Sequence, residues 1–147
     1  MIFLYGSYTL KIREKTMDTR EAITTRRSTR RYLNKKIDKN MMEKIIEAGR
    51  YAPSGGNSQF DHFFVIQDEA VLKKIRELVV SAFSKMEVYE GMYRSLAVSI
   101  TLSKKGNYIY DYNAPCLIVV ANRKDYGNRK QDTACAIQTS GHSRPVR

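Results

Sequence analysis

The most constraining feature of this sequence is an apolar periodicity that begins after Asp68 and continues for four turns. Apolar residues recur at spacings of three and four, which places them on one face of a helix. They are Val71, Leu72, Ile75, Leu78, Val79, Ala82, Phe83 and Met86. Asp68 stands where its carboxylate can cap the first turn. A helix with this face needs a sheet or another chain to cover it, and we expect Phe83 and Met86 to be core residues.

A second amphipathic helix is predicted from Asn40 to Ala52. Asn40, followed three residues later by Glu43, has the pattern of a capping box. Pro53 disfavours a helical conformation in the residue before it, so the helix ends by Ala52. Its apolar stripe consists of Met41, Met42, Ile45, Ile46 and Gly49.

Runs of aromatic and β-branched residues predict two buried strands, at 63–66 and 116–120. A short helix capped by Asp18 and another that opens at Asp132 complete the predicted elements. Two strands are too few, because a packed sheet usually has roughly four to six. Either the tyrosine-rich segment 89–112 supplies further strands, or part of the domain lies outside this chain.

The composition indicates one module that attracts anions. With 147 residues the chain is long enough for one domain, and 26 Lys and Arg against 15 Asp and Glu give a formal charge of +11. We find no signal peptide and no run near the roughly 20 apolar residues of a membrane span, so we expect a cytoplasmic protein without membrane partners. The only cysteines, Cys116 and Cys135, lack the spacing of a metal or redox motif and are expected to be buried reduced thiols.

Three guanidinium groups and two hydroxyls occur within one short segment, Arg26-Arg27-Ser28-Thr29-Arg30. Each guanidinium is a planar fork of donors that matches two phosphate oxygens, and a hydroxyl can bind an oxygen that the forks leave. This composition is typical of a phosphate site. Further basic residues follow up to Lys39, so a solvated basic surface is the alternative interpretation.

A stretch of small and polar residues, Pro53 to Gln59, follows the second helix directly. Glycine allows a ligand to approach the backbone closely, and the Asn57 amide offers both donors and an acceptor. These properties favour a loop that contacts a flat ligand. An ordinary helix-terminating turn would have the same composition, and the segment alone does not separate the two interpretations.

Taken together and in this order, Arg26 to Tyr32, Glu47 to Gln59 and Asn113 to Val120 resemble the nitroreductase family of FMN-dependent oxidoreductases. The resemblance runs from about Asp18 to Gln138, and residues 132–138 resemble the start of that family's central dimer helix. It implies an α+β fold of a sheet and helices in three layers. It also implies an obligate homodimer with one FMN at each end of the interface.

The resemblance also implies which residues bind the cofactor. Arg26, Arg27, Ser28 and Arg30 would hold the FMN phosphate and ribityl chain. Pro53, Ser54, Gly55 and Asn57 would form the loop that the partner subunit lays against the flavin. No side chain of this chain is expected to act as a catalytic nucleophile. NAD(P)H would transfer hydride to FMN and dissociate, and the reduced FMN would then pass it to a nitroaromatic, quinone or similar acceptor, in ping-pong order.

Some segments depart from the family pattern. Phe60-Asp61 stands where many members have Pro-Trp. We expect 1–16 to be an N-terminal extension, 17–138 to be the N-terminal part of a nitroreductase-like domain, and 139–147 to be an off-pattern tail. The sequence thus predicts a domain that is incomplete at its C-terminus. A chain truncated in this way could have the family ancestry and still be inactive.

A basic module that binds anions or nucleic acid through Arg20 to Lys39 is the alternative function. Such binding would weaken steeply with salt, because it releases counterions. Acidic residues, among them Asp38 and Glu43, are mixed with the basic ones, and no recognition helix is legible. We therefore expect no specific nucleic-acid partner.

Overall fold

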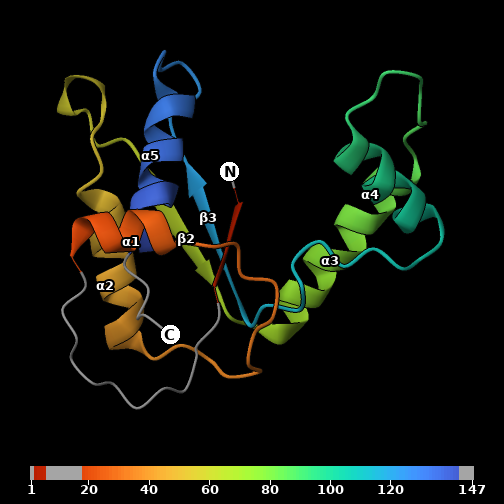
Figure 1. Cartoon of the computed structure of the whole chain (residues 1–147), viewed down its shortest axis with the longest axis horizontal. Helices are drawn as coiled ribbons and strands as arrows, with labels where there is room; N and C mark the ends of the chain where they lie inside the picture. The colour runs from red at the N-terminus through yellow and green to blue at the C-terminus, as the bar shows by residue number, and fades with distance from the viewer. Residues whose placement is uncertain (1, 6–17, 143–147) are drawn as a thin grey trace.

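The structure, a computed structural model of the chain, describes residues 2–5 and 18–142. Helices and strands are mixed along the chain, which confirms the predicted α+β class (Figure 1). In chain order they are β1 (Ile2–Tyr5), α1 (Thr19–Thr25), α2 (Lys39–Arg50), the 3₁₀ turn η1 (Gly55–Asn57), β2 (His62–Ile66), α3 (Glu69–Ser84), α4 (Arg94–Lys104), β3 (Cys116–Ala121) and α5 (Arg129–His142).

The three strands form one antiparallel sheet in the order β1-β3-β2. Val119 of the central strand lies opposite Ile2 on one side and Phe64 on the other. The predicted strand β3 is buried, whereas β2 is an edge strand with Phe64 56% exposed. No element was predicted near the N-terminus, where β1 adds the third strand. Most of the predicted extension, 1–16, lies outside the described residues.

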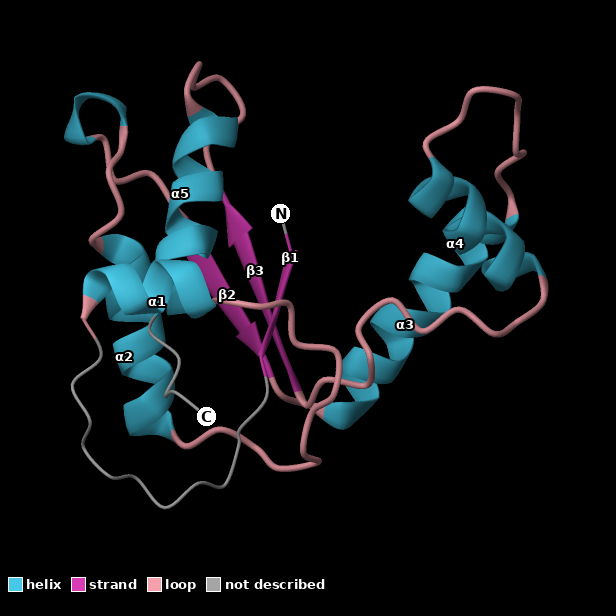
Figure 2. Ribbon diagram, in the orientation of Figure 1, coloured by secondary structure: helices cyan, strands magenta, loops and turns pink. Residues whose placement is uncertain are grey.

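Helices α2 and α5 pack together over the sheet and enclose the core (Figure 2). Ile45 of α2, Ala136 of α5 and Ile118 of β3 are almost completely buried there. Gly49 lets the helices come close, because a Cβ at this position would collide with Ser140 and would lie 2.9 Å from the Phe63 ring. The sheet and this helix pair are therefore two stacked layers.

The ends of both core helices differ from the prediction. Helix α2 begins at Lys39, because the carboxylate of Asp38 accepts a hydrogen bond from the Met41 N–H at 2.9 Å; Asn40 is not its cap. Helix α5 begins at Arg129 and continues to His142, although its sequence lacks a strong apolar stripe. The first four residues of the predicted tail 139–147 are thus helical, and the others lie outside the described residues.

Helices α3 and α4 pack against each other and project away from the sheet (Figures 1 and 2). Asp68 caps α3 as predicted, by accepting from the Val71 N–H at 2.9 Å. Its stripe is only partly covered, however: Leu72 is buried and Phe83 half-buried, whereas Leu78 is 58% and Met86 40% exposed. The expectation that Met86 is a core residue is wrong for the single chain.

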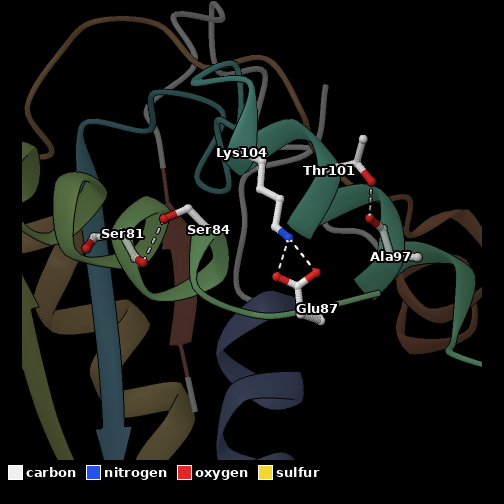
Figure 3. Close-up of polar contacts among 6 residues, drawn as sticks. All are labelled: Ser81, Ser84, Glu87, Ala97, Thr101 and Lys104. Carbon is white, nitrogen blue, oxygen red and sulfur yellow. Dashed lines mark hydrogen bonds and ion pairs between the residues drawn. The ribbon is translucent and has the colours of Figure 1, made fainter. Parts of the chain in front are cut away.

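The tyrosine-rich segment 89–112 contains helix α4 and supplies no strand, although further strands were one of two possibilities expected there. The last turn of α4 is joined to the chain after α3 by an ion pair, in which the Lys104 ammonium lies 2.8 Å from a carboxylate oxygen of Glu87 (Figure 3). Helices α3 and α4 together form an arm that projects from the sheet. At the base of this arm, Arg76 of α3 pairs with the buried carboxylate of Asp111 and donates to the Ala114 carbonyl oxygen at 3.2 Å. The pair of helices is therefore tied to the start of β3.

Two further sequence expectations concern the cysteines and the membrane. Both cysteines are free thiols; Cys116 is buried in β3 as expected, whereas Cys135 in α5 is only half-buried. Burial raises the pKa of the Cys116 thiol to about 12. Among the helices in the described part of the chain, none has both the length and the apolar character needed to cross a bilayer.

Candidate functional site

The loop that follows α2 has an unusual backbone. Gly56, Asn57 and Gln59 all have positive φ angles, of 59°, 55° and 48°. Non-glycine residues adopt this region infrequently, and they keep it only where their surroundings determine the conformation. The predicted ligand-contacting loop is therefore held in a specific shape and is more than a simple helix terminus.

Contacts from the far end of the sequence hold Gly55 at the start of this loop. The Gly55 N–H donates to both carboxylate oxygens of Asp132, each at 3.2 Å, and its carbonyl oxygen accepts from the Tyr126 hydroxyl at 2.8 Å. A Cβ on Gly55 would collide with Asn128 and lie 2.6 Å from the Tyr126 oxygen. Any other residue here would have to push the side chains of Asn128 and Tyr126 aside.

The end of the loop is anchored by the two residues that depart from the family pattern. The Asp61 carboxylate accepts from the Asn122 side-chain amide at 2.9 Å and from the Thr133 hydroxyl at 3.0 Å. The Phe60 ring meets the edge of Tyr126, with ring centroids 5.3 Å apart. The Arg123 guanidinium lies 4.8 Å from the Phe60 ring centroid, within range of a cation–π contact. Phe60 and Asp61 thus fix the end of the loop to the connection between β3 and α5 and to the first turns of α5.

The outer part of the loop faces solvent in the single chain. Pro53 and Asn57 are exposed, and Ser54 is half-buried with its hydroxyl accepting from the Gln59 N–H at 3.1 Å. A Cβ on Gly56 would have no neighbour within 4 Å. The open groups of the loop are therefore its Gly56 backbone and the Asn57 side chain, whereas both backbone polar groups of Gly55 are already hydrogen-bonded.

The basic segment leaves the end of α1, whose first turn is capped by Asp18. Its candidate residues Arg26, Arg27, Ser28 and Arg30 are all exposed. The Arg27 guanidinium folds back onto the chain and donates to the carbonyl oxygens of Thr24 at 3.0 Å and Arg26 at 2.8 Å. The segment therefore presents a strongly positive surface on which anions can bind.

One chain does not bring the two candidate segments together. In Figure 1 the loop at 53–61 lies beyond the upper end of α2, beside the connection to α5, whereas the segment after α1 runs across the sheet before it turns down to the start of α2. The assignment of the eight residues to one cofactor stays a prediction.

His62 is exposed at the start of β2. Within residues 2–5 and 18–142, no three His, Cys, Asp or Glu side chains come together as a potential metal site. What the described groups offer is anion binding and a shaped backbone.

Comparison with known proteins gives a family match. The model of the family described as "Nitroreductase family" matches residues 23–142. A curated protein of Archaeoglobus fulgidus, provisionally named an NADH dehydrogenase/NAD(P)H nitroreductase, is 47% identical over 55 residues. That alignment covers 37% of this chain and 32% of the relative, so the match spans about one third of the relative's length.

Solved structures give a longer match. A nitroreductase with bound FMN from Bacteroides fragilis superposes with a TM-score of 0.69 at 30% identity, over 87% of this chain and 64% of that one. One with bound FMN from Desulfitobacterium hafniense has a TM-score of 0.69 at 25% identity, over 87% and 65%. The family match over residues 23–142 includes both candidate segments and the core between them.

Proposed function

Because the chain belongs to the nitroreductase family, we propose that it is part of an FMN-dependent oxidoreductase that moves hydride from NAD(P)H to an oxidised acceptor. The observation that carries this proposal is the family match across residues 23–142, a single continuous match that includes both the basic segment and the shaped loop. The FMN-bound relative at 30% identity adds support. Nitroaromatics and quinones are the acceptor classes that we propose.

The basic segment suits the phosphate end of FMN. Arg26 and Arg30 are exposed, so their planar donor forks can reach phosphate oxygens, and the Ser28 hydroxyl lies between them in sequence. Arg27 donates to backbone carbonyls, which supports a role in shaping the segment as well as in adding charge. We propose that these four residues hold the phosphate and ribityl chain.

The loop suits the flat ring system. Pro53, Ser54, Gly55 and Asn57 surround a turn whose backbone is open at Gly56, so a planar ligand could approach the backbone there and meet the Asn57 side chain at its edge. Bound FMN would supply the redox chemistry itself. The residues of this chain would bind the cofactor, fix its orientation and present hydrogen-bonding groups to its edge.

We further propose a homodimer in which each flavin contacts the basic segment of one chain and the loop of its partner. The separation of the two segments within one chain supports this arrangement (Figure 1). So does the apolar surface left uncovered on the single chain, including Leu78 at 58% and Phe64 at 56% exposure. A partner subunit would bury such surface.

The direct test is to titrate the purified chain with FMN and follow flavin fluorescence. We expect saturable binding with one FMN per chain, in a protein that sediments as a dimer. Lys73→Ala, which changes an exposed cation on α3, serves as a matched control and should bind FMN as the wild type does. A colourless chain that takes up no FMN at any concentration would contradict the proposed function.

A further inference from the structure

The loop at 55–59 has a backbone that it would not keep by itself. Three of its residues have positive φ angles, and two of these, Asn57 and Gln59, are not glycine. Non-glycine residues are strained in this conformation, so the shape persists only when contacts from the surrounding structure determine it. Those contacts come from the chain around the start of α5.

Asp132 reaches both ends of the turn with one carboxylate. Both of its oxygens lie 3.2 Å from the Gly55 nitrogen, and one of them also lies 3.4 Å from the Ser58 hydroxyl. The side chain is only 5% exposed, so water cannot easily replace it. It belongs to the first turn of α5, where the helix dipole favours a negative charge.

Other contacts hold single points of the loop. Tyr126 binds the Gly55 carbonyl oxygen, and Asp61 fixes the residues that lead into β2. Within the loop, the Gln59 N–H donates to the Ser54 hydroxyl at 3.1 Å and the Ser58 N–H to the Gly55 carbonyl oxygen at 3.2 Å, but these bonds do not fix the loop to the rest of the domain. Asp132 differs from these contacts because it lies outside the loop and contacts both Gly55 and Ser58, and a carboxylate is a stronger acceptor than a neutral oxygen.

We propose that Asp132 is a positioning residue, which holds residues 55–58 in the conformation that presents Gly56 and Asn57 to the flavin of the partner subunit. The inference rests on the proposed function only where it names flavin as the ligand. The effect of Asp132 on the loop conformation can be measured in the absence of flavin. Asp132 would not touch the flavin, because its carboxylate is buried beneath the turn and is occupied by Gly55 and Ser58.

The test compares amide hydrogen exchange in Asp132→Asn, Asp132→Ala and wild-type protein. Asn keeps one acceptor oxygen for the Gly55 N–H, whereas Ala keeps none. We expect exchange across residues 54–60 to become about tenfold faster or more in the Ala variant and to rise less in the Asn variant. Gln131→Ala, at an exposed position in the same helical turn, is the control and should leave the loop unchanged.

Local and global effects are separated by exchange in α2 and β3. If the Asp132→Ala protein exchanges faster throughout the chain, the Asn variant decides: a rise confined to 54–60 supports the proposal, and no rise or a general rise overturns it. Exchange across 54–60 at the wild-type rate in both variants would also overturn it.

An FMN titration of the same proteins tests the ligand. The dissociation constant should increase in the order wild type, Asn, Ala, in parallel with loop exchange. Faster loop exchange with unchanged FMN affinity would overturn the flavin-facing role. If the wild-type chain takes up no FMN, the proposed function fails, and the exchange comparison still confirms or overturns the holding of the loop by Asp132.

Discussion

The hydroxyl of Tyr126 donates to the carbonyl oxygen of Gly55 at 2.8 Å, although 71 positions separate the two residues in the sequence. This bond ties the loop after α2 to the connection that precedes α5. Together with the Asp132 contact, it takes up both backbone polar groups of Gly55. The loop is therefore part of the packed domain and has little freedom to adapt to a ligand.

Tyr126→Phe removes this hydroxyl but keeps the ring against Phe60. The Gly55 carbonyl oxygen then keeps only the Ser58 N–H, at 3.2 Å, and we expect the free energy of unfolding to fall by about 1 kcal/mol. Urea unfolding monitored by circular dichroism measures the change. Tyr93→Phe, at a residue 77% exposed, should leave the midpoint unchanged. Equal midpoints for Tyr126→Phe and wild type would show that this bond contributes nothing to stability.

Gly55→Ala places a methyl group against Asn128 and the Tyr126 hydroxyl. Because the methyl group would displace the Tyr126 hydroxyl from the Gly55 carbonyl oxygen, we expect a loss of about 1–3 kcal/mol in unfolding free energy. Gly127→Ala is the matched control: it lies in the same connection, but a Cβ there meets nothing within 4 Å. If the two variants unfold at the same urea concentration, close packing at Gly55 is not what requires glycine.

Arg76→Met leaves the buried Asp111 carboxylate, which is 2% exposed, without its cation. Removing one member of a buried pair is costly, and we expect a loss of about 3 kcal/mol together with faster amide exchange in α3 and α4. Glu87→Gln breaks the exposed pair with Lys104 and should cost less than about 1 kcal/mol. A larger loss of stability in Glu87→Gln than in Arg76→Met would contradict the role of Arg76 in anchoring α3 and α4.

The Cys116 thiol should be inert in the native protein. Its pKa is raised by burial from 9.0 to about 12, so almost no thiolate forms near neutral pH. Alkylation with iodoacetamide at pH 8, read by mass spectrometry, should modify Cys116 only after urea is added. Rapid modification without urea would place this residue outside the core.

The same shift has a consequence for stability at high pH. The folded state holds the thiol proton more tightly than the unfolded state, so its stabilising contribution is fully present below pH 9. That contribution is lost as the pH rises from 9 towards 12. Cys116→Ala should therefore show a smaller fall in stability over this range than the wild type; an equal fall would argue against a buried thiol.

Local sequence patterns predicted the elements that have strong periods, and missed those that depend on distant partners. The helices after Asp38 and Asp68 and the strands β2 and β3 follow from apolar spacing. β1 is only four residues long and is defined by its pairing with β3. The apolar spacing after Asp68 identified one face of α3 but not what covers it, which is why Met86 was expected in the core and is 40% exposed.

For the candidate site too, the sequence indicated some residues and missed others. The composition of 26–30 and 53–59 marked both segments, because guanidinium forks and glycines have recognisable chemistry. The groups that hold the loop, Asp132 and Tyr126, lie more than 70 positions away, and nothing local in the sequence links them to Gly55. Only the fold brings them together. The exposed basic segment suits a phosphate of any origin, so the sequence alone left the nucleic-acid alternative open.

The most direct test of the central claim compares FMN with riboflavin, which lacks the phosphate, in wild-type protein and in the double variant Arg26→Ala/Arg30→Ala. We expect the wild type to bind FMN at least about tenfold more tightly than riboflavin, since charge-assisted bonds to phosphate are strong. The double variant should lose this preference and bind both equally weakly. If the wild type binds neither flavin, or if the preference for FMN survives in the double variant, the assignment of this segment to the flavin phosphate is contradicted.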